Sequence, residues 1–151
     1  MRAVLRAHLR HGAKKVHWHD EDTHGRDRLV SLVTSFHLDH VVVVCASEPS
    51  VRSERRRRLC LERLCDELQA RDVRLVKLES RGPSDKLDRA LVDALRSKRQ
   101  LESSTRIEHV PGPAEPLLWI ADTLCGAVTQ HRRGNPSHLR ALGSQVHLAE
   151  I

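Results

Sequence analysis

Hydrophobic and polar positions change their spacing along the chain, and each change marks the start or end of a predicted element. Apolar runs and apolar–polar alternation predict short strands, and apolar residues three or four positions apart predict amphipathic helices. The predicted strands cover residues 14–18, 41–46, 73–79 and 106–110, and residues 146–151 fit either an edge strand or a tail. The predicted helices cover 1–11, 26–36, 53–70 and 84–99, and a last one begins at 115–116 and fades near 134–136.

Strands that alternate with helices of ten or more residues are typical of an α/β protein. Residues 41–46 form an uninterrupted apolar run, mostly β-branched, which is typical of a strand covered on both faces. We therefore expect a mixed, mostly parallel sheet of at least three strands, flanked by helices on both faces. The length of 151 residues fits one domain with a single core, so we expect one domain over residues 1–151.

The two long central helices differ in what they expose. In the helix 84–99 the spacing predicts that the inward side chains are Leu87, Ala90, Leu91, Ala94 and Leu95. The helix 53–70 opens instead with four consecutive arginines, residues 55–58. Consecutive residues point to different sides of a helix, so these arginines cannot all face one phosphate groove. They favour a solvated face, or a mixture of salt bridges and weak nucleic-acid contacts.

Composition narrows the possible classes. The net charge of +6 comes mostly from arginine, which fits contacts with phosphates and an arginine-rich genome equally well. Aromatic residues make up only 2%, which argues against a platform that stacks single-stranded bases. The four cysteines form no CxxC pair, so we expect reduced core thiols. The chain shows no apolar run of membrane-spanning length and no signal-peptide pattern, and we expect a cytoplasmic protein.

One acid stands out in the nearly all-apolar helix that follows residue 116. Asp122 lies among leucine, isoleucine, tryptophan and alanine, and an ionised carboxylate there is costly unless it is paired, hydrogen-bonded or bound to a metal. Glu79 ends a predicted strand, where sites of α/β sheets form. Together the two acids could hold Mg²⁺ or Mn²⁺ and position water for phosphodiester hydrolysis. Alternatively, Glu79 pairs with Arg81 and Asp122 takes a local hydrogen bond.

A second polar group occupies residues 17–24, HWHDEDTH. His17 and His19 would share one side of a strand, and Asp20 and Glu21 follow directly. This spacing fits a transition-metal site, or further carboxylates for the same cleft. The interpretation that we favour is the polar exit of a strand, followed by a helix N-cap in the residues from Asp22 onward.

Several segments resemble an actinobacterial protein group with a ribonuclease-H-like fold. The most specific is HVPGPAEPLLWIADTLCGAV, and VRLVKLESRGP, RRRRLCLERL and KKVHWHDED are also similar. The resemblance implies a ribonuclease-H-like mixed sheet and two-metal-ion nuclease chemistry, with Asp122 as the helical carboxylate and Glu79 as the strand carboxylate. Members of that broader superfamily open with a strand that carries an Asp, often in the pattern D-E-S. This chain begins with RAVLRAHLR, and we expect another segment or a second copy to cover the exposed sheet edge.

The leading prediction is therefore a divalent-metal-dependent nuclease that uses Mg²⁺ or Mn²⁺. Its predicted catalytic residues are Glu79 and Asp122, which also bind the metal together with Asp20 and Glu21. The predicted nucleic-acid-binding residues are Arg55, Arg56, Arg58 and Arg81. The alternative is a non-catalytic module that binds nucleic acid or assembles through a sheet edge into a homo-oligomer. A third hypothesis is a metal site formed by His17, His19 and His24.

Overall fold

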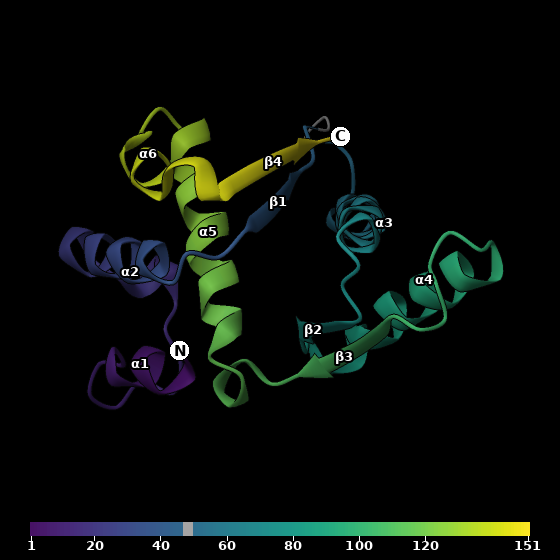
Figure 1. Cartoon of the computed structure of the whole chain (residues 1–151), viewed down its shortest axis with the longest axis horizontal. Helices are drawn as coiled ribbons and strands as arrows, with labels where there is room; N and C mark the ends of the chain where they lie inside the picture. Colours follow the sequence, from purple (N-terminus) through teal and green to yellow (C-terminus); the bar gives the residue numbers. More distant parts are fainter. Residues whose placement is uncertain (47–49) are drawn as a thin grey trace. The chain divides into compact units, whose positions relative to one another are not determined.

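The chain forms an α/β protein, and the computed structural model describes residues 1–46 and 50–151 (Figure 1). Its residues divide into two compact units. Unit 1 contains residues 1–42 and 111–147, and unit 2 contains residues 43–110 and 148–151. The chain therefore passes between the units after Val42, Val110 and His147.

Unit 1 is helical. Its helices are α1 (Arg2–Ala7), α2 (Thr23–Ser35), α5 (Leu117–Arg132) and α6 (Ser137–Leu142). The helices α2, α5 and α6 pack against one another. Their buried apolar side chains include Leu29, Val30, Val33, Trp119, Leu124, Ala127, Val128 and Leu142.

Trp18 packs the segment before α2 against α5. The indole is buried, and a Cβ added to Gly126 of α5 would overlap it, so the ring lies directly on the helix backbone. Arg26 holds its guanidinium carbon 5.3 Å from the centre of the same ring, and the His138 ring meets it edge-on at 5.1 Å. This arrangement depends on glycine at position 126.

The predicted strand 14–18 is wrong, because Trp18–Asp20 forms a short 3-10 helix. His17 is extended, with φ −133° and ψ 118°, as the apolar–polar alternation suggested. The backbone N–H of Trp18, however, donates to the Asp122 carboxylate at 2.8 Å and pairs with no strand. A side chain on α5 therefore takes the place of a strand partner.

Unit 2 contains a parallel strand pair and two long helices. The strands are β2 (Leu75–Glu79) and β3 (Arg106–Val110), in a register that places Leu75 opposite Arg106 and Glu79 opposite Val110. The helices are α3 (Ser53–Ala70) and α4 (Asp85–Ser97), which pack together. Their core consists of Leu61, Cys65, Leu91, Val92, Leu95 and Leu101, and Leu64, Leu78 and Ile107 pack against it.

A second strand pair joins β1 (His40–Val44) to β4 (Val146–Glu150). Ile151 donates to the Val44 carbonyl and accepts from the Ala46 N–H, both at 3.0 Å, which is the staggered pattern of parallel strands. The α/β class is thus confirmed. The single sheet of three or more strands is wrong, because the described residues form two separate two-stranded sheets.

Several predicted helix faces also need correction. In α4, Leu91 and Leu95 are buried as expected, but Leu87 is 47% exposed and Ala90 is exposed. Asp85 and Asp88 occupy the buried face in their place. The helix α5 is not buried all round, since Ala121 and Cys125 are exposed. The helix α6 was not predicted, although Asn135 supports its start by accepting from Ser137 N at 3.2 Å.

Among the described residues, no helix has both the length and the apolar character that a membrane crossing needs.

Candidate functional site

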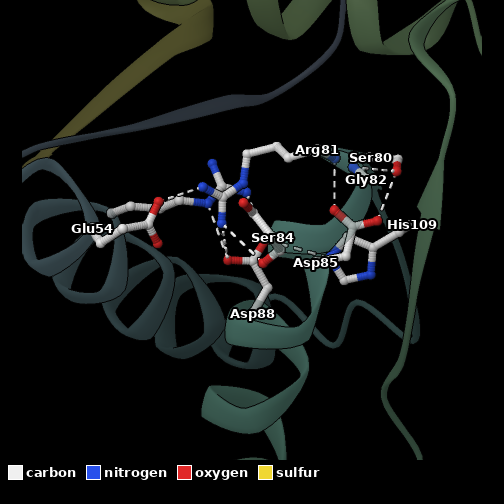
Figure 2. Close-up of polar contacts among 9 residues, drawn as sticks. Glu54, Ser80, Arg81, Gly82, Ser84, Asp85, Asp88 and His109 are labelled. Atoms are coloured by element: carbon white, nitrogen blue, oxygen red, sulfur yellow. Dashed lines mark hydrogen bonds and ion pairs between the residues drawn. The ribbon is translucent and has the colours of Figure 1, made fainter.

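A cluster of charged side chains gathers around Asp88 at the start of α4 (Figure 2). The Asp88 side chain is only 4% exposed. Arg57 donates to both of its oxygens, from Nε at 3.0 Å and from Nη2 at 2.8 Å. Arg81 Nη2 donates at 3.0 Å, and His109 Nε2 lies 3.3 Å from Oδ2. We name Glu54, Arg57, Arg81, Asp88 and His109 the Asp88 cluster.

The loop after β2 positions Arg81 in this cluster. Asp85, the first residue of α4, accepts from Ser80 Oγ and from the Arg81 backbone N–H, both at 2.6 Å. Gly82 has φ +63°, a conformation that favours glycine, and this allows the chain to turn sharply here. Arg81 then reaches Glu54 of α3 at 2.5 Å as well as Asp88. The loop is therefore held by side chains from two helices.

Both buried acids keep their charge. The Ser80 hydroxyl and the Arg81 amide hold the pKa of Asp85 below its usual value. Burial alone would raise the pKa of Asp88, but Arg57, His109 and Arg81 together outweigh it and lower that pKa. Each Asp88 oxygen has two nitrogen neighbours, so this carboxylate holds the cluster together and offers no open position for a cation.

Sequence reasoning missed Asp88, although a signal was available. Asp85 and Asp88 precede Leu91, Val92 and Leu95 at helical spacing, so they continue the buried stripe toward the start of α4. An acid in line with buried leucines indicates a carboxylate with cationic partners.

Within unit 2, the predicted site residues have different surroundings. Glu79 ends β2, is exposed and lies opposite Val110. Arg81 belongs to the Asp88 cluster, where two carboxylates bind it. Arg55, Arg56 and Arg58 lie on the first half of α3; Arg55 and Arg58 are exposed and Arg56 is half-buried.

The remaining predicted residues belong to unit 1. Asp122 Oδ2 accepts from the Trp18 backbone N–H at 2.8 Å and lies 3.2 Å from His17 Nδ1, and the Asp122 side chain is 36% exposed. Glu21 pairs with Arg10 at 3.2 Å. Asp20 is exposed, and its carbonyl accepts from Arg10. Asp122 thus has a hydrogen bond, as in the alternative to metal binding, but its donor lies 104 positions away in the sequence.

The histidine hypothesis and the carboxylate hypothesis both require a metal-binding group. His17 lies beside Asp122, whereas His19 and His24 are exposed. In residues 1–46 and 50–151, no group of three or more His, Cys, Asp or Glu side chains is arranged to hold a metal ion.

A groove of about 710 Å³ runs along α3 and α4 in unit 2. Its lining is mixed, with leucines and alanines between charged residues: Glu54, Arg55, Arg58, Leu59, Glu62, Leu87, Asp88, Ala90, Leu91 and Ala94. Leu59 is 38% exposed and Leu87 47% exposed. These two leucines lie outside the buried stripes of their helices, although helical spacing had placed Leu87 on the inward face, so the sequence did not reveal the groove.

Arginines in unit 2 fall into two groups. One group pairs with carboxylates within 4 Å: Arg57, Arg63, Arg71, Arg74, Arg81, Arg96 and Arg106. The other group has no carboxylate partner among the described residues, and it includes the neighbouring Arg55, Arg56 and Arg58 on α3. Four arginines of this second group, Arg52, Arg55, Arg56 and Arg58, lie at the start of α3, whereas Arg89 and Arg99 lie on and beyond α4.

Comparison of the chain with models of protein families, with curated proteins and with solved structures finds no match. The similarity to a ribonuclease-H-like group therefore stays a prediction.

Proposed function

We propose that unit 2 binds nucleic acid through Arg55, Arg56 and Arg58, which we name the arginine face. The observation that carries the proposal is the difference in pairing within this unit. Arg57 pairs with Asp88, whereas no carboxylate of the described residues lies within 4 Å of the arginine face. When an arginine has no acidic partner, its charge and its fork of N–H donors are available to a phosphate.

The geometry of α3 brings these three side chains to one side. Each residue advances about 100° around a helix, so Arg58, Arg55 and Arg56 span an arc of about 160°. Arg57 lies outside this arc, where it meets Asp88. Because Arg57 is already paired, only the other three arginines of the run are available, and they can contact successive phosphates of one nucleic-acid strand.

The test is binding of labelled RNA and DNA at several salt concentrations. We expect affinity to fall with salt, because each phosphate contact releases counterions. The triple variant Arg55→Gln, Arg56→Gln, Arg58→Gln should bind more weakly and reduce the slope of log affinity against log salt by about 2 to 3.

A matched control removes the same charge elsewhere in unit 2. The variant Arg89→Gln, Lys98→Gln, Arg99→Gln changes three exposed cations at and beyond α4. It should keep most of the affinity. Equal loss in the two triple variants would show that only net charge matters, and salt-insensitive binding would end the proposal.

Nuclease activity remains a prediction of the resemblance, with Mg²⁺ or Mn²⁺ as the metal. It is tested by metal-dependent cleavage of RNA, DNA and hybrid, which should be lost in Asp122→Asn and in Glu79→Gln. The asparagine at position 122 can still accept the Trp18 hydrogen bond, so its effect separates chemistry from folding. Cleavage unchanged in both variants would remove the assignment and leave the binding proposal standing.

A further inference from the structure

We infer that the arginine face and the α3–α4 groove form one site that selects single-stranded nucleic acid. Phosphates contact the arginines, and an unpaired base enters the groove. This inference rests on the proposed function and specifies its ligand.

The groove offers an apolar surface beside the cations. Leu59 and Leu87 are 38% and 47% exposed, and Ala90, Leu91 and Ala94 complete the apolar lining. A volume of about 710 Å³ lies within the range of pockets that take small organic molecules. Alanines at two positions on α4 leave room for a flat ring.

The charge around the groove is slightly positive once the arginines that pair with its lining acids are counted. Glu54 and Asp88 line it, but Arg81 binds both of them and Arg57 binds Asp88 as well. Their negative charge is therefore already balanced. Arg55 and Arg58 also line the groove, without a carboxylate partner among the described residues, and Glu62 is the remaining acid of the lining.

This combination fits a nucleotide with an accessible base. A ligand that matches this surface carries an anion next to a weakly polar body, and guanidinium planes can stack on unpaired bases. A duplex presents its phosphates but hides its bases in the stack. The inference does not need an aromatic platform, because aliphatic side chains and arginine supply the contact.

The experiment uses the full chain and three probes of about 12 nucleotides, a length suited to single-strand sites. The probes are a single strand, the duplex of the same sequence, and an abasic strand that keeps every phosphate. We expect the single strand to bind about five- to tenfold more tightly than the abasic strand, which is the low end of the range for stacking on an aromatic side chain. The duplex should bind no more tightly than the abasic strand.

Two groove variants test where the base goes. Ala90→Trp fills the groove from an exposed position, and Leu87→Gln makes its lining polar. Each variant should lower the affinity for the single strand toward the affinity for the abasic strand. The affinity for the abasic strand itself should not change. The matched control is Leu75→Gln, which alters a 52% exposed leucine of β2 outside the groove and should have no effect.

The possible failures are distinguishable. Equal affinity for all three probes, with the arginine face still required, overturns the groove inference alone. Polyphosphate binding as tight as the single strand does the same. An acidic, leucine-rich peptide that binds more tightly, and depends equally on Leu87 and Arg55, would assign the groove to a protein partner. If the full chain shows no salt-sensitive binding to any probe, both the inference and the proposed function are wrong.

Discussion

Asp88 in unit 2 and Asp122 in unit 1 are two helical acids with apolar neighbours, and their surroundings differ. The Asp88 side chain is 4% exposed and meets two arginines and a histidine. The Asp122 side chain is 36% exposed and meets one backbone amide and His17. The acid in the more apolar sequence is the more exposed of the two.

The difference shows that helix face decides burial, while the apolar fraction does not. The exposed side of α5 includes Ala121, Cys125 and Thr129, which are small enough to face solvent at little cost. In α4 the acids are in line with the buried leucines. A count of apolar residues therefore pointed to Asp122, and spacing would have pointed to Asp88.

The largest expected effect comes from Asp88→Ala. It leaves Arg57 and Arg81 without their shared carboxylate and should lower the free energy of unfolding by about 3 kcal/mol. This is the low end for a broken buried pair, because these arginine side chains are 35% and 27% exposed and gain some hydration. Urea unfolding followed by far-UV circular dichroism measures it. A loss in the free energy of unfolding smaller than that of Asp122→Ala would show that Asp122, and not Asp88, is the more important acid for stability.

Acid should weaken the wild type through the same cluster. Asp85 and Asp88 have pKa values below the ordinary 3.8 in the folded protein. Their stabilisation is therefore complete above that pH and is lost as the pH falls toward the folded pKa values. We expect the urea concentration at the unfolding midpoint to decrease as the pH is lowered below about 4, and to decrease less steeply in Asp88→Ala. Parallel slopes in the two proteins would contradict this assignment.

A smaller effect is expected from Asp122→Ala. Loss of the hydrogen bond from Trp18 N should cost about 1 kcal/mol, since water can reach this half-exposed site. Both tryptophans, Trp18 and Trp119, belong to unit 1, so tryptophan fluorescence during unfolding reports on this change. Asp122→Asn retains an acceptor and should recover part of the loss. A loss as large as that of Asp88→Ala would show a buried, essential acid.

Thiol labelling gives the mildest contrast. Cys125 of α5 is exposed, whereas Cys65 of α3 is 2% exposed and burial raises its pKa to about 11. With iodoacetamide near the ordinary thiol pKa of about 8.5, Cys125 should react first and Cys65 last, as read by peptide mass spectrometry. Urea should abolish the difference. Rapid labelling of Cys65 in the native protein would place the α3 core in contact with solvent.

Local elements were predictable from the sequence. The helix Ser53–Ala70 and the strand Arg106–Val110 have the predicted bounds, because apolar spacing within each segment determines them. Pairings between distant segments were not predictable. Arg57 and His109 lie 31 and 21 positions from Asp88, and helical or strand spacing carries no information about such partners. For the same reason, the division of the strands into two pairs was missed.

Gly126 reverses a common rule of protein engineering. Alanine in place of a glycine inside a helix normally adds about 1 kcal/mol of stability. At this position the new methyl group would require the space that the Trp18 indole fills, so the backbone gain would be offset by the displaced ring. Among alanine substitutions along α5, Gly126→Ala should therefore be destabilising. A smaller residue at position 18 should allow alanine at position 126 without this loss of stability.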